Sequence, residues 1–465
     1  MAKESLRVDL DAGATATEED IAVSIFRAYL RIKTVEPNPA YEEAVQFLIG
    51  FGKTVGFGGG RATYEELYCR GMKGLLKHEK FQQMNVGFSL DEDEAVEFLT
   101  ALGRSVFLDV DVIRVEANMP VVILSLPGKE PSLPSIMLYS HMDVVPAYAE
   151  SWTYGPFSGY KDEKGDIYGR GAQDMKVNGI QYISAIRRLQ QRQEASFLRT
   201  IHIVFGPDEE LYCRGMKGLL NHEKFMKMNV GFSLDEGIAS TDDVYRMYYA
   251  ERNSWWVHAE CNGSTGHASR ILNDTAGEKV MKVINKLVGI SNENIQKLKD
   301  NPDMSAGEIM TVNLTKLEGG APGLALNVVP ESMHAYFDIR VPPTANPRRF
   351  KAQLQKWLNE CGDDIWVNVI RSQDISAMSD PNSHFILAME EAFEEAGAKH
   401  KLEMFPGGTD SKYLRQAGIQ AIGLTAMINT EQLLHEHNER LNEKTFLEGL
   451  ELYTRIIPKI ANCDF

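Results

Sequence analysis

Cysteine is scarce in this sequence, and its spacing excludes two kinds of stabilising site. Only five of the 465 residues are cysteines, and no two of them form a Cys-x-x-Cys pair. Neither a disulfide framework nor a zinc site built from thiolates is therefore expected. Any metal ion that this chain binds must be held by His, Asp and Glu side chains.

Long apolar runs and an excess of basic residues are also missing. The sequence contains no run of about 18 consecutive apolar residues, the length needed to span a bilayer. Residues 1–20 are polar and acidic, unlike a secretory signal. The formal net charge of -16 argues against a surface that binds phosphate groups. We therefore expect a cytoplasmic protein without a nucleic-acid or membrane partner.

The sequence does contain an α/β pattern between residues 135 and 232. Apolar runs at 136–140 and 200–206 predict buried strands, and isoleucines at three-residue steps over 180–186 predict a helix that covers a sheet. Alternating strands and helices of this kind are typical of an α/β fold with a largely parallel sheet.

Longer strands mixed with helices follow from about residue 249, which predicts an inserted α+β domain. The α/β pattern returns near Asp380. We therefore predict a discontinuous catalytic domain over 1–248 and 371–465, interrupted by a lid domain over 249–370.

An internal repeat marks the N-terminal part. Residues 65–92 recur at 209–236 with only three differences, and a duplicated or inserted block over 42–92 is the simplest description. Two distant copies do not make a solenoid. Only the second copy follows an apolar strand that could aim its carboxylates, so we expect that copy to supply the functional glutamates.

Side chains that could bind a metal ion are concentrated at the predicted ends of strands and in nearby loops. Each motif taken singly is more often a solvated turn, but their convergence in one α/β unit would make a zinc site. These motifs contain His141 and Asp143, Asp174, Glu209 and Glu210, Glu236, and His435.

The motifs SHMDVVPA, GRGAQDMK, LDEG, GHASR and LLHEHNERL, in this order, resemble the aminoacylases of the di-zinc exopeptidase family. That family also contains carnosine dipeptidases and succinyl-diaminopimelate desuccinylases. The resemblance extends from Ile21 to the C-terminus, apart from the block at 42–92. It implies a catalytic domain of the di-zinc exopeptidase type, a lid that also forms a homodimer, and hydrolysis of N-acyl-L-amino acids.

The resemblance also implies roles for the motif residues around two zinc ions per subunit. Asp174 would bridge the ions, Asp143 would orient the ring of His141, and Glu209 would be the general base that acts on metal-activated water. A cis peptide bond is expected after Asp174. The remaining ligands would be His141 and Glu236 for one ion, and Glu210 and His435 for the other.

Further residues are implied in substrate binding and in the dimer. His267 would reach the active site of the other subunit and stabilise the oxyanion, and Arg340 would hold a carboxylate through two hydrogen bonds. Asn327, Gly408 and Thr409 would line the pocket.

One departure from the family pattern leaves alternatives open. A Gly-Gly pair usually follows the two glutamates, whereas this chain has Leu211-Tyr212-Cys213, whose side chains could crowd the pocket. A zinc-binding protein that has lost turnover is therefore one alternative. A dipeptidase or desuccinylase on the same scaffold is another, because pocket size and charge cannot be read from one sequence.

Overall fold

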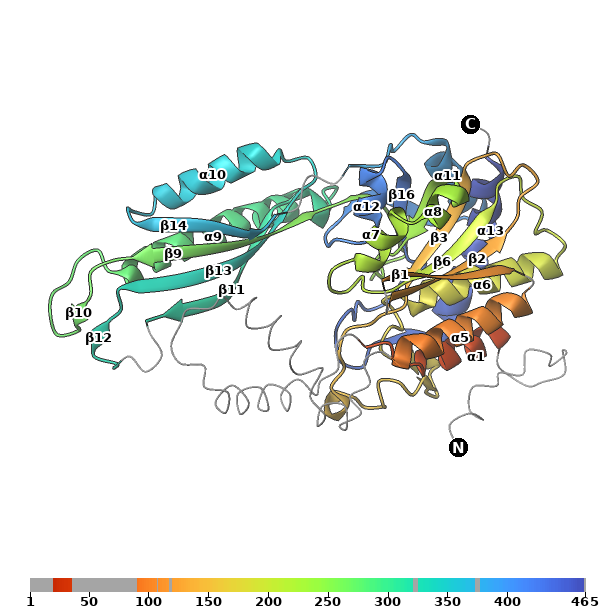
Figure 1. Cartoon of the computed structure of the whole chain (residues 1–465), viewed down its shortest axis with the longest axis horizontal. Coiled ribbons are helices and arrows are strands. Elements are labelled where there is room, and N and C mark those ends of the chain that lie inside the picture. The colour runs from red at the N-terminus through yellow and green to blue at the C-terminus, as the bar shows by residue number, and fades with distance from the viewer. Residues whose placement is uncertain are drawn as a thin grey trace.

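The computed structural model describes residues 20–35, 90–106, 108–116, 119–320, 325–372 and 377–463. Nearly all of the first repeat copy lies outside these ranges, so the expectation about that copy stays a prediction. The rest forms two bodies, one around each of two large sheets (Figure 1).

The larger body contains an eight-stranded sheet. Its centre is parallel, since β3 runs parallel to both β6 and β7, and β7 runs parallel to β16. In sheet order the strands are β1 Asp109–Glu116, β2 Met119–Leu126, β6 Ile201–Gly206, β3 Ser135–His141, β7 Val230–Asp235, β16 Gln420–Leu424, β8 Val244–Glu251 and β15 Lys399–Phe405.

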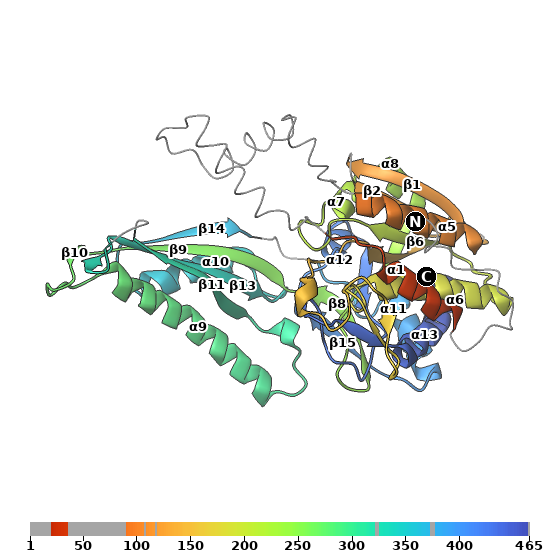
Figure 2. The same ribbon diagram turned by 90° about the horizontal axis from the view of Figure 1, so that it is seen from below.

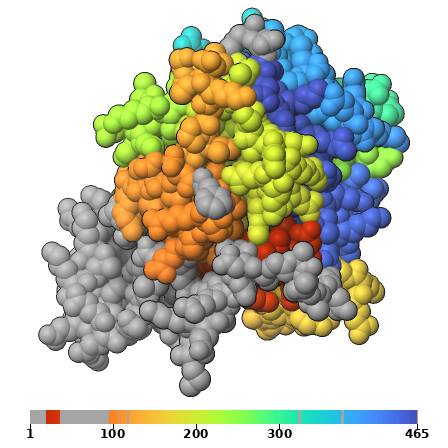
Figure 3. Space-filling view, turned by 90° about the vertical axis from the view of Figure 1, so that its right-hand side faces the viewer, coloured from red at the N-terminus to blue at the C-terminus, as the bar shows by residue number. Residues whose placement is uncertain are grey.

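Helices cover both faces of this sheet, which explains why its central strands are apolar throughout. Alternate residues of β2 enter two separate cores, with Val122 and Leu124 on one face and Val121 and Ile123 on the other. The first face packs against α1 Ile21–Leu30, α5 Leu90–Ser105, α6 Lys176–Gln191, α11 His384–Glu395 and α13 Glu443–Asn462. The second packs against α7 Arg214–Leu220, α8 Glu223–Met228 and α12 Ser411–Gln416. Segments from distant parts of the chain therefore lie side by side on this body (Figure 3).

The smaller body is built on a four-stranded antiparallel sheet with its own apolar core. Its strands, in order, are β11 Thr311–Gly319, β13 Ser332–Val341, β9 Asn253–Asn262 and β14 Ile365–Arg371. One face is covered by α9 Ala276–Asp300, which begins with a capping box between Thr275 and Glu278, and by α10 Pro347–Asn359. The predicted α/β fold with a smaller antiparallel unit is confirmed.

Short elements complete the described chain. They are the ribbon of β10 Gly266–His267 and β12 Val328–Val329, the sheet of β17 Arg440–Asn442, β5 Asp166–Tyr168 and β4 Tyr160–Lys161, and the 3-10 turns η1 Ala149–Ser151 and η2 Ala306–Glu308. None of the described helices combines the length and the apolar character that crossing a bilayer requires.

The two bodies are joined over a short distance. Arg252 is the single residue between β8 and β9, and on the return path the backbone N–H of Ser379 donates to the carbonyl of Tyr249 at 2.9 Å. The domain limits at 248/249 and 370/371 stay a prediction. Near these limits, β8 continues to Glu251 and β14 continues to Arg371.

Two helical glycines predict opposite effects of the same substitution. A Cβ at Gly179 in α6 would lie 2.3 Å from the ring of Phe205, whereas a Cβ at Gly289 in α9 would meet nothing within 4 Å. We expect Gly179→Ala to destabilise the protein by about 1–3 kcal/mol through overpacking, and Gly289→Ala to stabilise α9 by up to about 1 kcal/mol. Thermal or urea unfolding measures both, and equal shifts in one direction would contradict the packing described for α6.

Candidate metal centre

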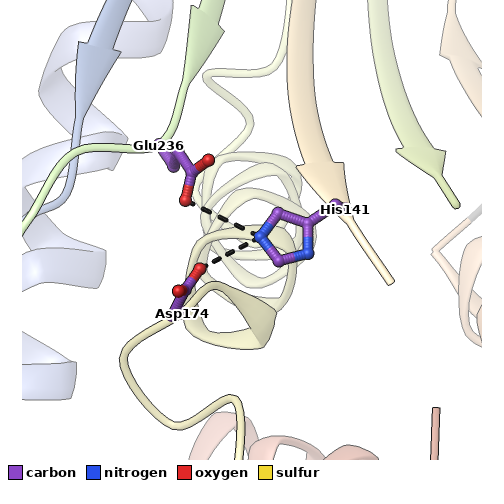
Figure 4. Close-up of side chains that lie close together, drawn as sticks. All are labelled: His141, Asp174 and Glu236. Carbon is purple, nitrogen blue, oxygen red and sulfur yellow. Dashed lines mark hydrogen bonds and ion pairs between the residues drawn. The ribbon is translucent and has the colours of Figure 1, made fainter. Parts of the chain in front are cut away.

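His141 stands at the carboxyl end of β3, with its ring orientation fixed from behind. Its Nδ1 lies 2.8 Å from the backbone carbonyl of Asp143, and a carbonyl can only accept, so Nδ1 donates. Its Nε2 faces the carboxylates of Asp174 at 3.0 Å and Glu236 at 3.6 Å (Figure 4). Nε2, the nitrogen that would be free to bind a metal ion once its proton is lost, is therefore aimed between two carboxylates.

Asp174 connects two groups of potential ligands. One oxygen contacts His141, and the other lies 3.2 Å from Nε2 of His435, which in turn lies 3.0 Å from Glu210. In the described part of the chain, two sets of side chains could hold a metal ion: a first group of His141, Asp174 and Glu236, and a second group of Asp174, Glu210 and His435. The predicted cis peptide between Asp174 and Met175 is present.

Charge is concentrated in this cluster, and the pKa values of its groups shift accordingly. Burial raises the pKa of Glu236 well above its usual range, and the charge of Asp174 raises it further. Hydrogen bonds to Asp174 and Glu210 raise the pKa of His435 to about 10. Burial alone would lower the pKa of His141, but its contacts with Asp174 and Glu236 outweigh this and raise it. In the metal-free cluster, the positive charge of the protonated imidazoles therefore offsets the repulsion between the carboxylates.

Glu209 lies beside the cluster without belonging to either group. Burial, followed by the charge of Glu236, raises its pKa well above the usual range. Its backbone N–H and that of Glu210 donate to the two oxygens of Asp143, at 3.2 and 3.1 Å. Asp143 thus makes its shortest contact with His141 through its carbonyl, whereas its carboxylate, 3.7 Å from the same Nδ1, accepts both N–H groups of the loop that carries the two glutamates.

The donor set fits a zinc site. Imidazole nitrogens and carboxylate oxygens are ligands that zinc commonly takes in proteins, and the candidate ligand atoms of each group lie within 4.8 Å of one another. Asp174 presents one oxygen to each group, as a residue that bridges two ions must.

The predicted lid residues do not join this cluster. His267 and Asn327 contact each other at 3.1 Å on the β10–β12 ribbon, at the end of the smaller body farthest from the eight-stranded sheet (Figures 1 and 2). Arg340 lies on β13 and already holds a carboxylate, since it donates to both oxygens of Asp338 at 2.6 and 3.2 Å.

Gly408 and Thr409 precede α12 in the larger body. Thr409 is buried, and both its backbone N–H and its hydroxyl donate to Glu251, at 3.1 and 3.0 Å. Glu251 also pairs with the buried Arg415. The side chain of Thr409 is therefore used to anchor its loop, which leaves the backbone near Gly408 as the part that a substrate could meet.

Comparison with known proteins decides the family. The model of a family described as "Peptidase family M20/M25/M40" matches residues 137–459, more than half of the chain. The chain belongs to this peptidase family. Aminoacylase-1A of Rattus norvegicus is 38% identical over 447 residues, which cover 96% of each chain. The resemblance to aminoacylases that the motifs indicate is confirmed.

Solved structures share the fold at low sequence identity. Human carnosine dipeptidase 1 matches with a TM-score of 0.59 and 15% identity, over 91% of this chain and 99% of its own. A Bacillus subtilis protein described as a dinuclear metal binding peptidase of the M20 family matches with a TM-score of 0.58 and 16% identity, over 80% of this chain and 94% of its own.

Leu211, Tyr212 and Cys213, which stand where the family resemblance implies a Gly-Gly pair, differ from one another in burial. Leu211 and Tyr212 are exposed, at 38% and 56%, whereas Cys213 is buried. Cys213 has a φ of 54°, a left-handed conformation that a glycine adopts without steric cost. The departure therefore puts one side chain, not three, into the interior.

Sequence reasoning missed the residues that support the M20 cluster from behind. Glu439 is fully buried and accepts hydrogen bonds from Arg170, Gly171, Gln173 and Asp174. The motifs GRGAQD and HEHNER contain these residues, but nothing in either motif indicates that the two loops are bonded to each other.

Zinc affinity should depend on pH, because the imidazoles of the metal-free M20 cluster carry protons. The pKa of about 10 for His435 means that zinc must displace a proton at neutral pH. We expect the apparent affinity to rise between about pH 6 and pH 8, by roughly tenfold per pH unit for each proton released. Calorimetry in buffers of different ionisation enthalpy measures the protons directly.

The matched variants are His435→Gln, which should flatten this pH dependence, and His437→Gln, which should leave it unchanged. His437 is exposed and belongs to neither ligand group. A zinc affinity that is independent of pH in the unaltered protein would contradict the protonated cluster.

Proposed function

We propose that this protein is a zinc-dependent aminoacylase that hydrolyses N-acyl-L-amino acids, such as N-acetylmethionine, to a carboxylate and a free L-amino acid. The observation that carries the proposal is Asp174, whose two oxygens face the two ligand groups, with Glu209 beside both and inside neither. The 38% identity to an aminoacylase-1 over 96% of the chain supports the substrate class.

Two zinc ions are proposed per subunit, held by His141, Asp174 and Glu236 and by Asp174, Glu210 and His435. Zinc bound there would polarise the scissile carbonyl and lower the pKa of the attacking water. Three ligand carboxylates against two divalent cations leave a net charge of +1, which attracts a substrate that bears a carboxylate.

Glu209 is the proposed general base. It would take the proton of the attacking water and pass it to the leaving amine, without a covalent intermediate. Burial and the charge of Glu236 raise its pKa above the usual range of a glutamate, which makes the carboxylate a stronger proton acceptor.

Arg340 is proposed to bind the carboxylate of the substrate, with His267, Asn327, Gly408 and Thr409 completing the pocket. Two of the five N–H donors of the guanidinium bond Asp338, which leaves three for a ligand. Asp338 would then fix the plane of the guanidinium rather than block it.

A homodimer through the smaller body, in the cytoplasm, is part of the same proposal. The ribbon with His267 lies at the end of the smaller body farthest from the sheet that carries the metal cluster (Figure 1). A second copy is therefore the simplest way to bring that histidine to an active site.

Glu209→Gln tests the base. We expect two metal ions per subunit to remain while the rate falls by roughly two to four orders of magnitude, because the variant loses a proton acceptor and no ligand. Metal analysis and hydrolysis of N-acetylmethionine measure both. Loss of metal would place Glu209 among the ligands instead.

Assays on three substrates separate the alternatives. An aminoacylase prefers N-acetylmethionine over carnosine and succinyl-diaminopimelate, whereas a dipeptidase or desuccinylase reverses this order. Retained metal without hydrolysis of any of the three would favour a zinc-binding protein that has lost turnover.

Mixing inactive variants tests the dimer. His267→Ala should lose activity, and subunit exchange with Glu209→Gln should restore part of it, since one site of the mixed dimer has both residues intact. No recovery after verified exchange would place His267 at its own subunit's site.

A further inference from the structure

Glu439 is the most heavily hydrogen-bonded carboxylate behind the metal cluster, although it belongs to neither ligand group. It is fully buried. Its Oε1 accepts the backbone N–H groups of Gln173 at 2.6 Å and Asp174 at 3.2 Å, and its Oε2 accepts that of Gly171 at 3.0 Å. One side chain thus fixes the backbone of the loop that ends in the bridging ligand.

Arg170 extends this support to the second loop. Its Nη1 donates to Glu439 at 2.8 Å, and its Nη2 donates to the carbonyl of His435 at 3.3 Å. Gln173 adds three hydrogen bonds between the same two loops. Its side-chain amide donates to the carbonyls of Glu431 and Arg440 and accepts from the N–H of Leu433. The loops that carry Asp174 and His435 are therefore held as one unit.

The two ligand groups depend unequally on this unit. In the first group, His141 ends β3 and Glu236 directly follows β7, so the sheet positions both and only Asp174 needs the unit. In the second group, Asp174 and His435 both come from the bonded loops.

We propose that Glu439, acting with Arg170, is a positioning residue that sets the affinity of the second ion, the one held by Asp174, Glu210 and His435. The inference rests on the proposed di-zinc function. It makes the second group the more easily emptied site.

Glu439→Gln is the decisive variant. The amide keeps the shape of the side chain but replaces one acceptor oxygen with a donor. Because each oxygen of Glu439 accepts two hydrogen bonds, two donors lose their partner whichever way the amide is turned. We expect the second zinc ion to bind about 10–100-fold more weakly and the first to change by less than about threefold, since two of its three ligands stand on the sheet.

Competition with a chelator measures the two affinities on the full chain, and the absorption spectrum of the cobalt-loaded protein reports the geometry of each ion. Glu436→Gln is the matched control. Glu436 lies in the same segment, is exposed and contacts neither loop through any hydrogen bond of its side chain that the structure shows, so both affinities should match the unaltered protein.

Unfolding of the metal-free variants shows whether Glu439→Gln folds. If it does not, Arg170→Lys keeps the proposal testable. Lysine retains the charge beside Glu439, but its single nitrogen cannot reproduce the planar fork that bonds both Glu439 and the carbonyl of His435. Selective weakening of the second ion in either variant supports the proposal. Equal weakening of both ions, or no change in a folded variant, overturns it, and fewer than two ions in the unaltered protein overturns the proposed function itself.

Discussion

Carboxylates that are brought together in a buried cluster repel one another, and the structure around this site depends on how that repulsion is balanced. Asp174, Glu209, Glu210 and Glu236 lie close enough to perturb one another's pKa values. In the metal-free chain, protons on the imidazoles supply the opposing charge, and in the proposed enzyme two cations supply it. The sheet and the bonded loops are what keep these like charges in place until a cation arrives.

Part of this arrangement could be predicted because parallel strands impose it. β6, β3 and β7 are neighbours that run in the same direction, so the residues at their carboxyl ends meet at one edge of the sheet. The strands predicted over 136–140 and 200–206 place His141 and Glu209 at that edge, whereas the strand before Glu236 was not predicted. Asp174 and His435 come from loops, whose paths are not dictated by strand periodicity; their motifs suggest ligands, but only the family resemblance implied which ion each would hold.

The rest depends on backbone turns that one sequence does not reveal. From the sequence, Glu439 is one polar residue in a polar segment. In the structure, the chain folds back so that four hydrogen-bond donors surround its carboxylate. The sequence places Asp143 near His141, but it does not reveal that the carbonyl makes the shorter contact while the carboxylate accepts hydrogen bonds from the loop of Glu209 and Glu210. Asp338 and Arg340 lie two residues apart on β13 and so share a face, but the hydrogen bonds between them depend on rotamers that the sequence does not specify.

The short connection between the two bodies has an evolutionary meaning. The chain leaves the larger body after Glu251, the last residue of β8, and comes back beside the same strand at Ser379, whose backbone N–H donates to the carbonyl of Tyr249. An excursion that starts and ends at one point can be gained, lost or exchanged without disturbing the sheet on which the metal ligands stand. The smaller body is in this sense a replaceable module, so selection could change it without moving the sheet and loops that carry the candidate metal ligands.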